Sequence, residues 1–196
     1  VSYAIEGSIY AAGTTVQWLR DNLEFFSASE LSEQYLKNNG DSNNTHFIPA
    51  FTGLGAPYWN SDIRASFHGM TRDTSKADMV NAAFNSITYQ TKDIIDCLKN
   101  IDIELKSLKI DGGMVANKVF TQQIANLLNT NVLVPDNKES TARGAAVLAG
   151  VASQIYDIEL VEQQKRTEIK PEVQANEFML NDYKRWKNLI NKALLP

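Results

Sequence analysis

The chain has 196 residues, of which 43% are hydrophobic and 21% are charged, a composition typical of an ordinary globular protein. Its net charge of −4 offers no basic face for nucleic acid, and no apolar run reaches the ~20 residues that a membrane span needs. Cys97 is the single cysteine, which excludes a disulfide framework and a cysteine-based zinc site. We expect a cytoplasmic protein. The chain begins VSYAIEG without a methionine, and we expect it to be a fragment of a longer protein.

In the first half of the chain, β-branched and aromatic residues over 1–10 predict a strand. A helix should follow over 11–26, with Thr14 or Thr15 as its cap, because apolar residues recur there at helical spacing. The polar stretch 37–46 predicts a surface loop, and 47–59 holds too many Pro and Gly residues for a regular element. The clearest helix is predicted over 79–100. Its apolar face is formed by Val80, Phe84, Ile87, Thr91, Ile94 and Leu98.

The second half alternates short apolar runs with helical patterns. Strands are predicted at SLKI and NVLV, and the helices at 115–128 and 142–152. The buried stripe of the first of these helices is predicted to be Phe120, Ile124, Leu127 and Leu128. From about Asp157 the chain is charged and ends in a helix. Its residues available for docking are Phe178, Tyr183, Trp186, Ile190 and Leu194. This order of elements predicts an α/β fold with a parallel sheet.

The turn between SLKI and the next helix has the composition of a ligand-binding turn. In parallel α/β sheets, ligands bind beyond the carboxyl ends of the strands, where helices begin. Gly112 and Gly113 let a ligand lie directly on the backbone, and a helix start favours phosphate. Asn117 follows Gly113 by one helical turn, so its amide can face the same ligand. The alternative is a tight turn whose glycines only permit the geometry. Asp111 lies near enough for phosphate or Mg²⁺, although an aspartate that stabilises the turn is the simpler interpretation.

A second helix start repeats this spacing, because Gly13 is followed one turn later by Gln17. Two such starts can hold one ligand from two sides. Uncharged amides suit a nucleobase or ribose, because they both donate and accept hydrogen bonds. The alternative is an ordinary capped helix whose Gln17 faces solvent.

Several segments resemble one known family. YAIEGSIYAAGTTVQWLRD, IPAFTGLGAPYW, ITYQTKDII, IDGGMVANKVF and TARGAAVLAG resemble the carboxyl-terminal part of the FGGY carbohydrate kinases, in the order in which that family has them. FTGLGAPYW is similar to the glycerol kinases in particular. The resemblance implies a ribonuclease-H-like, actin-like ATPase fold that is incomplete at its first strands. Residues 1–196 would then be one nucleotide-binding domain, with a core over about 1–156 and a charged tail with a terminal helix over 157–196.

The resemblance also implies an activity. FGGY glycerol kinases transfer the γ-phosphate of ATP to glycerol with Mg²⁺, giving ADP and sn-glycerol 3-phosphate. It implies that Gly13, Gln17, Gly113 and Asn117 contact the nucleotide, and that the catalytic base and the glycerol site belong to the part that precedes this chain. We therefore expect no catalytic residue and no metal ligand here, an inactive isolated fragment, and a homo-oligomeric whole enzyme. The alternatives are a kinase of the same family that acts on another sugar or polyol, and a degenerate nucleotide-binding module.

The implied fold also suggests where adenine lies. With phosphates at the glycine turns, the base must lie further along, between the two helices. Val16 and Met114 stand beside the binding residues and are predicted to form the apolar slot. The alternative is that both pack in the core.

Overall fold

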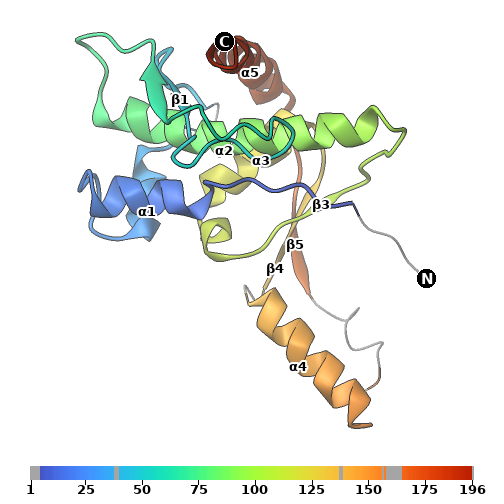
Figure 1. The fold of residues 1–196 in the computed structure, drawn as a ribbon. Helices are drawn as coiled ribbons and strands as arrows, with labels where there is room; N and C mark the ends of the chain where they lie inside the picture. Colours follow the sequence, from blue (N-terminus) through green and yellow to red (C-terminus); the bar gives the residue numbers. More distant parts are fainter. Residues whose placement is uncertain (1–4, 38–39, 137–138, 156, 158–164, 196) are drawn as a thin grey trace.

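The structure is a computed structural model that describes residues 5–37, 40–136, 139–155, 157 and 165–195. Figure 1 shows helices packed around α2, with a small sheet to one side. In chain order the elements are α1 (Gly13–Asp21), η1 (Ser29–Tyr35, a 3₁₀ helix), β1 (His46–Ile48), β2 (Ser66–His68), α2 (Lys76–Lys99), β3 (Leu108–Lys109), η2 (Gly113–Ala116, a 3₁₀ helix), α3 (Lys118–Leu128), β4 (Val132–Pro135), α4 (Ser140–Ala152), β5 (Arg166–Ile169) and α5 (Val173–Ala193). No helix among the described residues is long and apolar enough to cross a membrane.

The long helix α2 forms the centre of the core. It starts at a capping box, in which the Ser75 hydroxyl accepts from the Asp78 N–H and the Asp78 carboxylate accepts from the Ser75 N–H. The helix therefore begins three residues before the predicted start, in a polar first turn. Of the predicted face, Val80, Phe84 and Ile87 are buried, while the later positions are half-buried.

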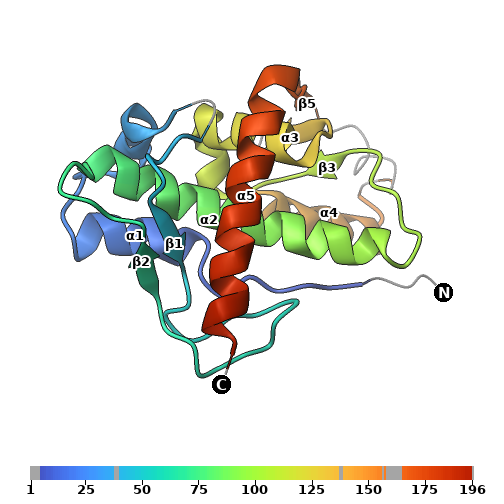
Figure 2. The same cartoon turned by 90° about the horizontal axis from the view of Figure 1, so that it is seen from above.

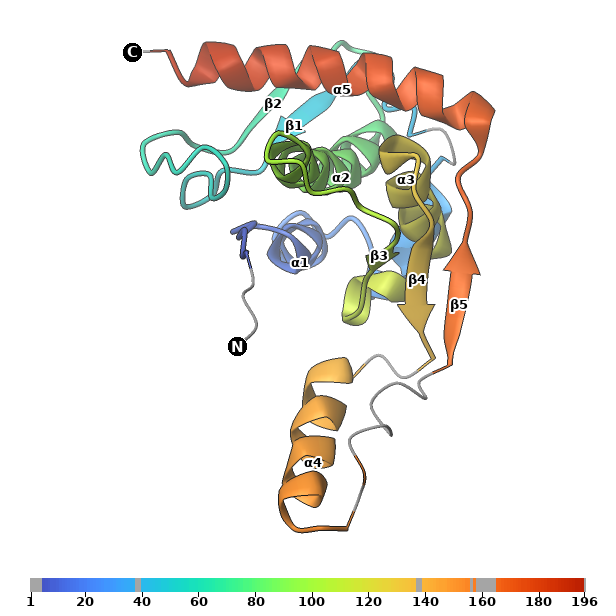
Figure 3. The ribbon, with the colours of Figure 1, turned by 90° about the vertical axis from the view of Figure 1, so that its right-hand side faces the viewer.

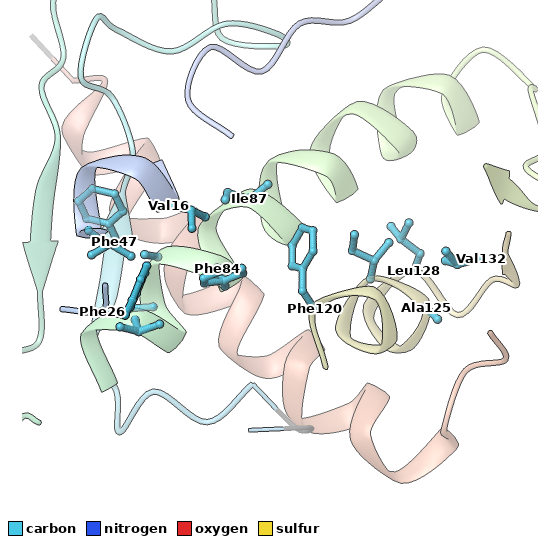
Figure 4. Packing of buried hydrophobic residues seen from close by; sticks show 14 of the residues in the cluster. Val16, Phe26, Phe47, Phe84, Ile87, Phe120, Ala125, Leu128 and Val132 are labelled. Atoms are coloured by element: carbon cyan, nitrogen blue, oxygen red, sulfur yellow. The ribbon is translucent and has the colours of Figure 1, made fainter. Parts of the chain in front are cut away.

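The apolar face of α2 joins α1 to α3. Figure 4 shows Val16 from α1 beside Phe84 and Ile87, with Phe120 of α3 on the other side. The rings of Phe84 and Phe120 meet edge to face, with centroids 5.5 Å apart. The predicted buried stripe of α3 is confirmed, because all four of its residues are buried. This packing fixes the position of the α1 start relative to the α3 start.

The sheet beside these helices is mixed and not wholly parallel. β3 and β4 run parallel, as predicted, but β5 pairs antiparallel with β4, from Val132–Ile169 to Pro135–Arg166. The segment that forms β5 is charged and exposed, so it carries no apolar pattern that predicts a strand. β1 and β2 form a separate antiparallel pair.

The strand predicted over 1–10 is not found in residues 5–10, and residues 1–4 lie outside the described residues. The segment 5–10 is held instead by the loop after β1, where the Ala56 N–H donates to the Ser8 carbonyl at 2.9 Å. A Cβ on Gly55 would lie 2.2 Å from that same oxygen, so glycine is required for this close approach. Residues 5–10 therefore pair with no strand among the described residues, although their aromatic and branched side chains are typical of a strand.

The C-terminal helix α5 packs across α3, α2 and β1, as Figure 2 shows from above. Trp186 and Ile190 are fully buried, as predicted, but Phe178 is 42% exposed and Met179 is buried in its place. The buried residues Met179, Asp182, Trp186 and Ile190 repeat every three or four positions, and Phe178 is out of phase with them. The division of the chain into a core and a tail stays a prediction.

Polar groups buried under α5 are paired across long sequence separations. The Asp182 carboxylate contacts Nε2 of His46 at 3.0 Å and accepts from the Tyr89 hydroxyl at 2.7 Å. The buried Asp93 carboxylate accepts hydrogen bonds from the hydroxyls of Tyr58 and Tyr183. The pKa of both phenols is raised, mainly by burial and to a smaller extent by the hydrogen bond to Asp93. These pairs connect α5 to β1, α2 and the loop after β1.

Candidate functional site

The first side of the candidate site is the start of α1. Gly13 opens the helix, with Ala12 as its N-cap and no side-chain cap. The predicted threonine cap is therefore wrong, because the Thr15 hydroxyl donates back to the Ala11 carbonyl at 2.7 Å. One turn later Gln17 is exposed, while Val16 is only 5% exposed. The glycine and the amide thus lie on the accessible part of the helix, and Val16 connects them to the core.

The second side is the turn after β3, which differs from the prediction. A helix was predicted over 115–128, but Gly113–Ala116 forms a 3₁₀ turn and α3 begins at Lys118. Asn117 is the N-cap of α3, and its Oδ1 accepts from the Phe120 N–H at 2.9 Å. An asparagine favours this position because it satisfies an otherwise unpaired N–H of the first turn. Asn117 therefore offers the site its amide nitrogen, and its oxygen holds the helix.

The two sides line one cavity of about 340 Å³. Six predicted residues border it: Gly13, Val16, Gln17, Gly113, Met114 and Asn117. The volume lies in the range of sites for small molecules. Val16 packs in the core and also lines the cavity, so packing in the core does not exclude a place in the cavity wall. The structure brings the two glycine–amide pairs to one place, as the sequence predicted.

Neither Gly13 nor Gly113 is required by the fold of the described residues. A Cβ added at either residue would meet no protein atom within 4 Å, and neither has a backbone φ in the left-handed region. Gly112 differs, because its φ of 91° is one that side chains rarely adopt. Gly112 thus serves the turn, whereas Gly13 and Gly113 leave open space over the backbone at the cavity.

Asp111 and Gly112 do not line this cavity. Asp111 is exposed and borders a separate hollow of about 260 Å³ together with Lys109, Ser140 and Arg166. The described residues contain no group of three or more His, Cys, Asp or Glu side chains that could hold a metal ion. A role of Asp111 or Gly112 toward phosphate or Mg²⁺ stays an untested prediction.

Besides Ala116 of η2, four further residues of the cavity wall were missed by the sequence analysis. Ser29, Glu30 and Ser32 come from η1, and Phe84 comes from the buried face of α2. A 3₁₀ helix of seven residues has no 3.6-residue periodicity, so no sequence pattern indicated that η1 covers the site. Phe84 was predicted only as a core residue, and with 1% exposure it is indeed buried in the core.

The wall of the cavity carries little formal charge, and that charge is negative. Glu30 is the one formally charged side chain among the described residues that line it. Nearby, Arg20 of α1 binds both carboxylate oxygens of Asp21 and donates to the Ser29 hydroxyl at 3.1 Å. The hydrogen bond to Asp21 raises the pKa of the Arg20 guanidinium. Described residues therefore supply backbone, amides and apolar surface to the cavity but no cation.

Comparison with known proteins places this geometry in a family. Residues 1–153 match the model of the FGGY family of carbohydrate kinases, C-terminal domain. Glycerol kinase from Bacillus subtilis is 41% identical over 197 residues, which cover 99% of this chain and 40% of that protein. Glycerol kinase from Xanthomonas campestris (strain 8004) is 49% identical over 154 residues, which cover 78% of this chain and 31% of that protein.

Solved structures agree. A crystal structure of Plasmodium falciparum glycerol kinase with ADP superposes with a TM-score of 0.79 and 31% identity, over 96% of this chain and 38% of that one. Xylulose kinase from Lactobacillus acidophilus, at 22% identity and a TM-score of 0.79, shares the fold over 95% of this chain and 39% of that one. The chain spans about 40% of the length of the Bacillus relative. The chain belongs to the FGGY family of carbohydrate kinases, and what it contains of such a kinase is the C-terminal, actin-like ATPase domain.

Proposed function

We propose that this chain is the nucleotide-binding part of a glycerol kinase, and that ATP or ADP occupies the cavity between α1, η1 and η2. The observation that carries the proposal is that Gly13, Gln17, Gly113 and Asn117 border one cavity of about 340 Å³. Both glycines leave open space over the backbone that the fold itself does not need. A related glycerol kinase structure was determined with ADP, which supports a nucleotide as the ligand.

Each part of the cavity suits a different part of the nucleotide. Phosphate oxygens can approach the backbone at Gly13, where the first N–H groups of α1 are oriented outward and the helix dipole is positive. The apolar surface of Val16, Phe84 and Met114 suits the flat face of adenine. The amides of Gln17 and Asn117 suit the polar edges of the nucleoside. The chain's residues therefore bind and orient the nucleotide.

We propose that the groups that carry out the phosphate transfer lie in another part of the kinase. We assign no catalytic base here, since the FGGY resemblance places it before residue 1. No cation lines the cavity among the described residues, and they bring together no cluster that fits Mg²⁺. Phosphoryl transfer relies on positioning and on neutralising charge, and we propose that the rest of the kinase supplies the charged groups. We also propose that the whole enzyme uses Mg²⁺, is cytoplasmic and is a homo-oligomer.

The exposed helix α4 supports a close contact with that missing part. Figure 3 shows α4 standing away from the layer of α1, α2 and α3. Leu148 on α4 is 59% exposed, and Ile155 just after it is 69% exposed. Soluble proteins rarely leave such an apolar helix uncovered. We infer that the preceding part of the kinase covers it.

The test is a kinase assay on the full-length enzyme with ATP and a panel of glycerol, xylulose and gluconate. We expect ADP formation with glycerol and identification of the product as sn-glycerol 3-phosphate. Fast turnover of xylulose or gluconate without turnover of glycerol would favour the second candidate, another kinase of the family. Nucleotide binding without turnover of any of the three would favour the degenerate module.

A further inference from the structure

The 3₁₀ helix η1 forms a third wall of the cavity, opposite the starts of α1 and η2. Ser29, Glu30 and Ser32 line the cavity from this side. None of them was assigned by motif or by spacing. A ligand that fills this cavity would therefore lie against η1 as well as against the two glycine turns.

This wall is already held in place without a ligand. Its first residue accepts a hydrogen bond from Arg20 of α1, and the buried Ser32 hydroxyl accepts one from Nδ2 of Asn117 at 3.3 Å. The Glu33 carboxylate accepts from the Lys118 N–H at 2.8 Å, at the first turn of α3. η1 is therefore tied to α1 and to α3, the helices that define the site.

Glu30 stands out on this wall because it is the charged side chain among the described residues that line the cavity. Its charge acts on the nearby Arg20 guanidinium, but among the described residues its carboxylate accepts no hydrogen bond, whereas Asp21 accepts from Arg20 and Glu33 accepts from the Lys118 N–H. Glu30 also borders a neighbouring open hollow, formed with Leu31, Gln34 and Val119. It therefore lies at the boundary between the cavity and solvent, where its oxygens can accept hydrogen bonds from a ligand.

The charge of Glu30 restricts what it can face. A carboxylate repels phosphates, so the phosphates must lie toward the glycine turns, away from η1. It accepts hydrogen bonds and donates none, so it selects hydroxyl or amino groups of the nucleoside. The apolar surface of Val16, Phe84 and Met114 takes the base inward, and this leaves the ribose at the solvent-facing mouth.

We propose that Glu30 is a specificity-determining residue whose carboxylate accepts a hydrogen bond from the 2′-hydroxyl group of the ribose of the bound nucleotide. This inference rests on the proposed nucleotide site. It assigns to η1 the discrimination between ribonucleotides and deoxyribonucleotides.

The test compares Glu30→Ala with the wild type in the full-length kinase, using ATP, 2′-deoxy-ATP and the triphosphate of purine riboside, which lacks the 6-amino group. We expect the variant to raise KM for ATP about tenfold with kcat nearly unchanged, the loss typical of one charge-assisted hydrogen bond. KM for 2′-deoxy-ATP should change little, so the preference for ATP should largely disappear. Glu177→Ala, which removes an exposed carboxylate from α5, is the matched control and should leave all three KM values unchanged.

The outcomes separate this inference from the site itself. If the variant keeps the wild-type preference for ATP over 2′-deoxy-ATP, the ribose assignment is wrong. The same holds if only discrimination against the purine riboside nucleotide is lost, because Glu30 would then accept from the base. If the wild-type enzyme binds no ATP or ADP in a calorimetric titration, the nucleotide site itself is wrong. Binding that is lost in Gly113→Val but unchanged in Glu30→Ala would leave the site standing without this role for Glu30.

Discussion

Nδ2 of Asn117 donates a hydrogen bond to the Ser32 hydroxyl at 3.3 Å, while Oδ1 of the same amide caps α3 at the Phe120 N–H. One side chain thus fixes the start of α3 and the position of η1, on two sides of the same cavity. The amide orientation follows from these partners, since the N–H of Phe120 requires an acceptor. Asn117 therefore has a structural role in addition to the ligand contact proposed for it.

These two roles of Asn117 can be separated by substitution. Asn117→Asp keeps an acceptor for the Phe120 N–H, so the free energy of unfolding should fall by less than about 0.5 kcal/mol, whereas Asn117→Ala loses the cap and about 1 kcal/mol. Both variants should weaken ADP binding, because both lose the donor toward Ser32 and the cavity. Thermal unfolding and calorimetric titration of the full-length kinase measure the two effects. Equal ADP affinity in Asn117→Asp and the wild type would remove Asn117 from the site.

Met114 provides a test of the adenine slot. Substituting Met114 by Asp places a charge on the half-buried apolar surface that is proposed to face the base. The affinity for ATP should fall about tenfold or more in the full-length kinase, because burying a charge against adenine is unfavourable. Met114→Leu, which keeps the apolar surface, is the control and should bind nearly normally. A folded Met114→Asp enzyme with unchanged ATP affinity would show that Met114 does not line the slot.

The capping box of α2 predicts a dependence of stability on pH. Burial of Asp78 opposes its ionisation, but hydrogen bonds from Ser75 and the nearby Lys37 charge outweigh this effect and lower its pKa. The group therefore stabilises the fold above its unfolded pKa of about 3.9, and this contribution is lost as the pH falls through the lower folded pKa. Asp78→Asn should unfold more easily at neutral pH than the wild type, and the difference should shrink toward pH 3. A constant difference from pH 7 to pH 3, followed by circular dichroism, would contradict this origin.

The isolated chain is expected to have no kinase activity. It holds the proposed nucleotide contacts, but the catalytic base and the glycerol site are expected in the preceding part of the kinase. The purified fragment should not form glycerol 3-phosphate from ATP and glycerol above the level of a Gly113→Val fragment. Turnover by the wild-type fragment alone would mean that an acid of this chain acts as the base.

The sequence predicts the long amphipathic helices well and the short elements poorly, and the two predicted glycine–amide pairs do line one cavity. α2 and the buried stripe of α3 follow from their apolar periodicity, which packing against one core enforces. The first turn of α3 was misplaced, because the cap at Asn117 competes with continuing the helix from Gly113. The same side chain also donates to Ser32, a partner far away in the sequence that the local pattern cannot indicate.

The same limit explains the elements that were missed. β5 is an exposed, charged edge strand, whose pairing with β4 is set by the backbone and not by side-chain pattern. η1 takes its place from bonds to Arg20, Asn117 and Lys118, all outside its own segment. The placement of Gly13 and Gly113 at one cavity was predictable because each glycine precedes an amide by one helical turn, which is a local pattern.

The most direct test of the account is a calorimetric titration of ADP into the full-length kinase carrying Gly13→Val or Gly113→Val. Each substitution places a side chain in the open space over the backbone at the cavity, where an added Cβ would meet no protein atom within 4 Å. Thr14→Val, at the exposed residue next to Gly13, which does not line the cavity, is the matched control. We expect both glycine variants to remain folded and to lose ADP affinity about tenfold or more, the scale of overfilling a closely packed site, while Thr14→Val binds as the wild type does. Wild-type ADP affinity in both folded glycine variants would contradict a nucleotide in this cavity.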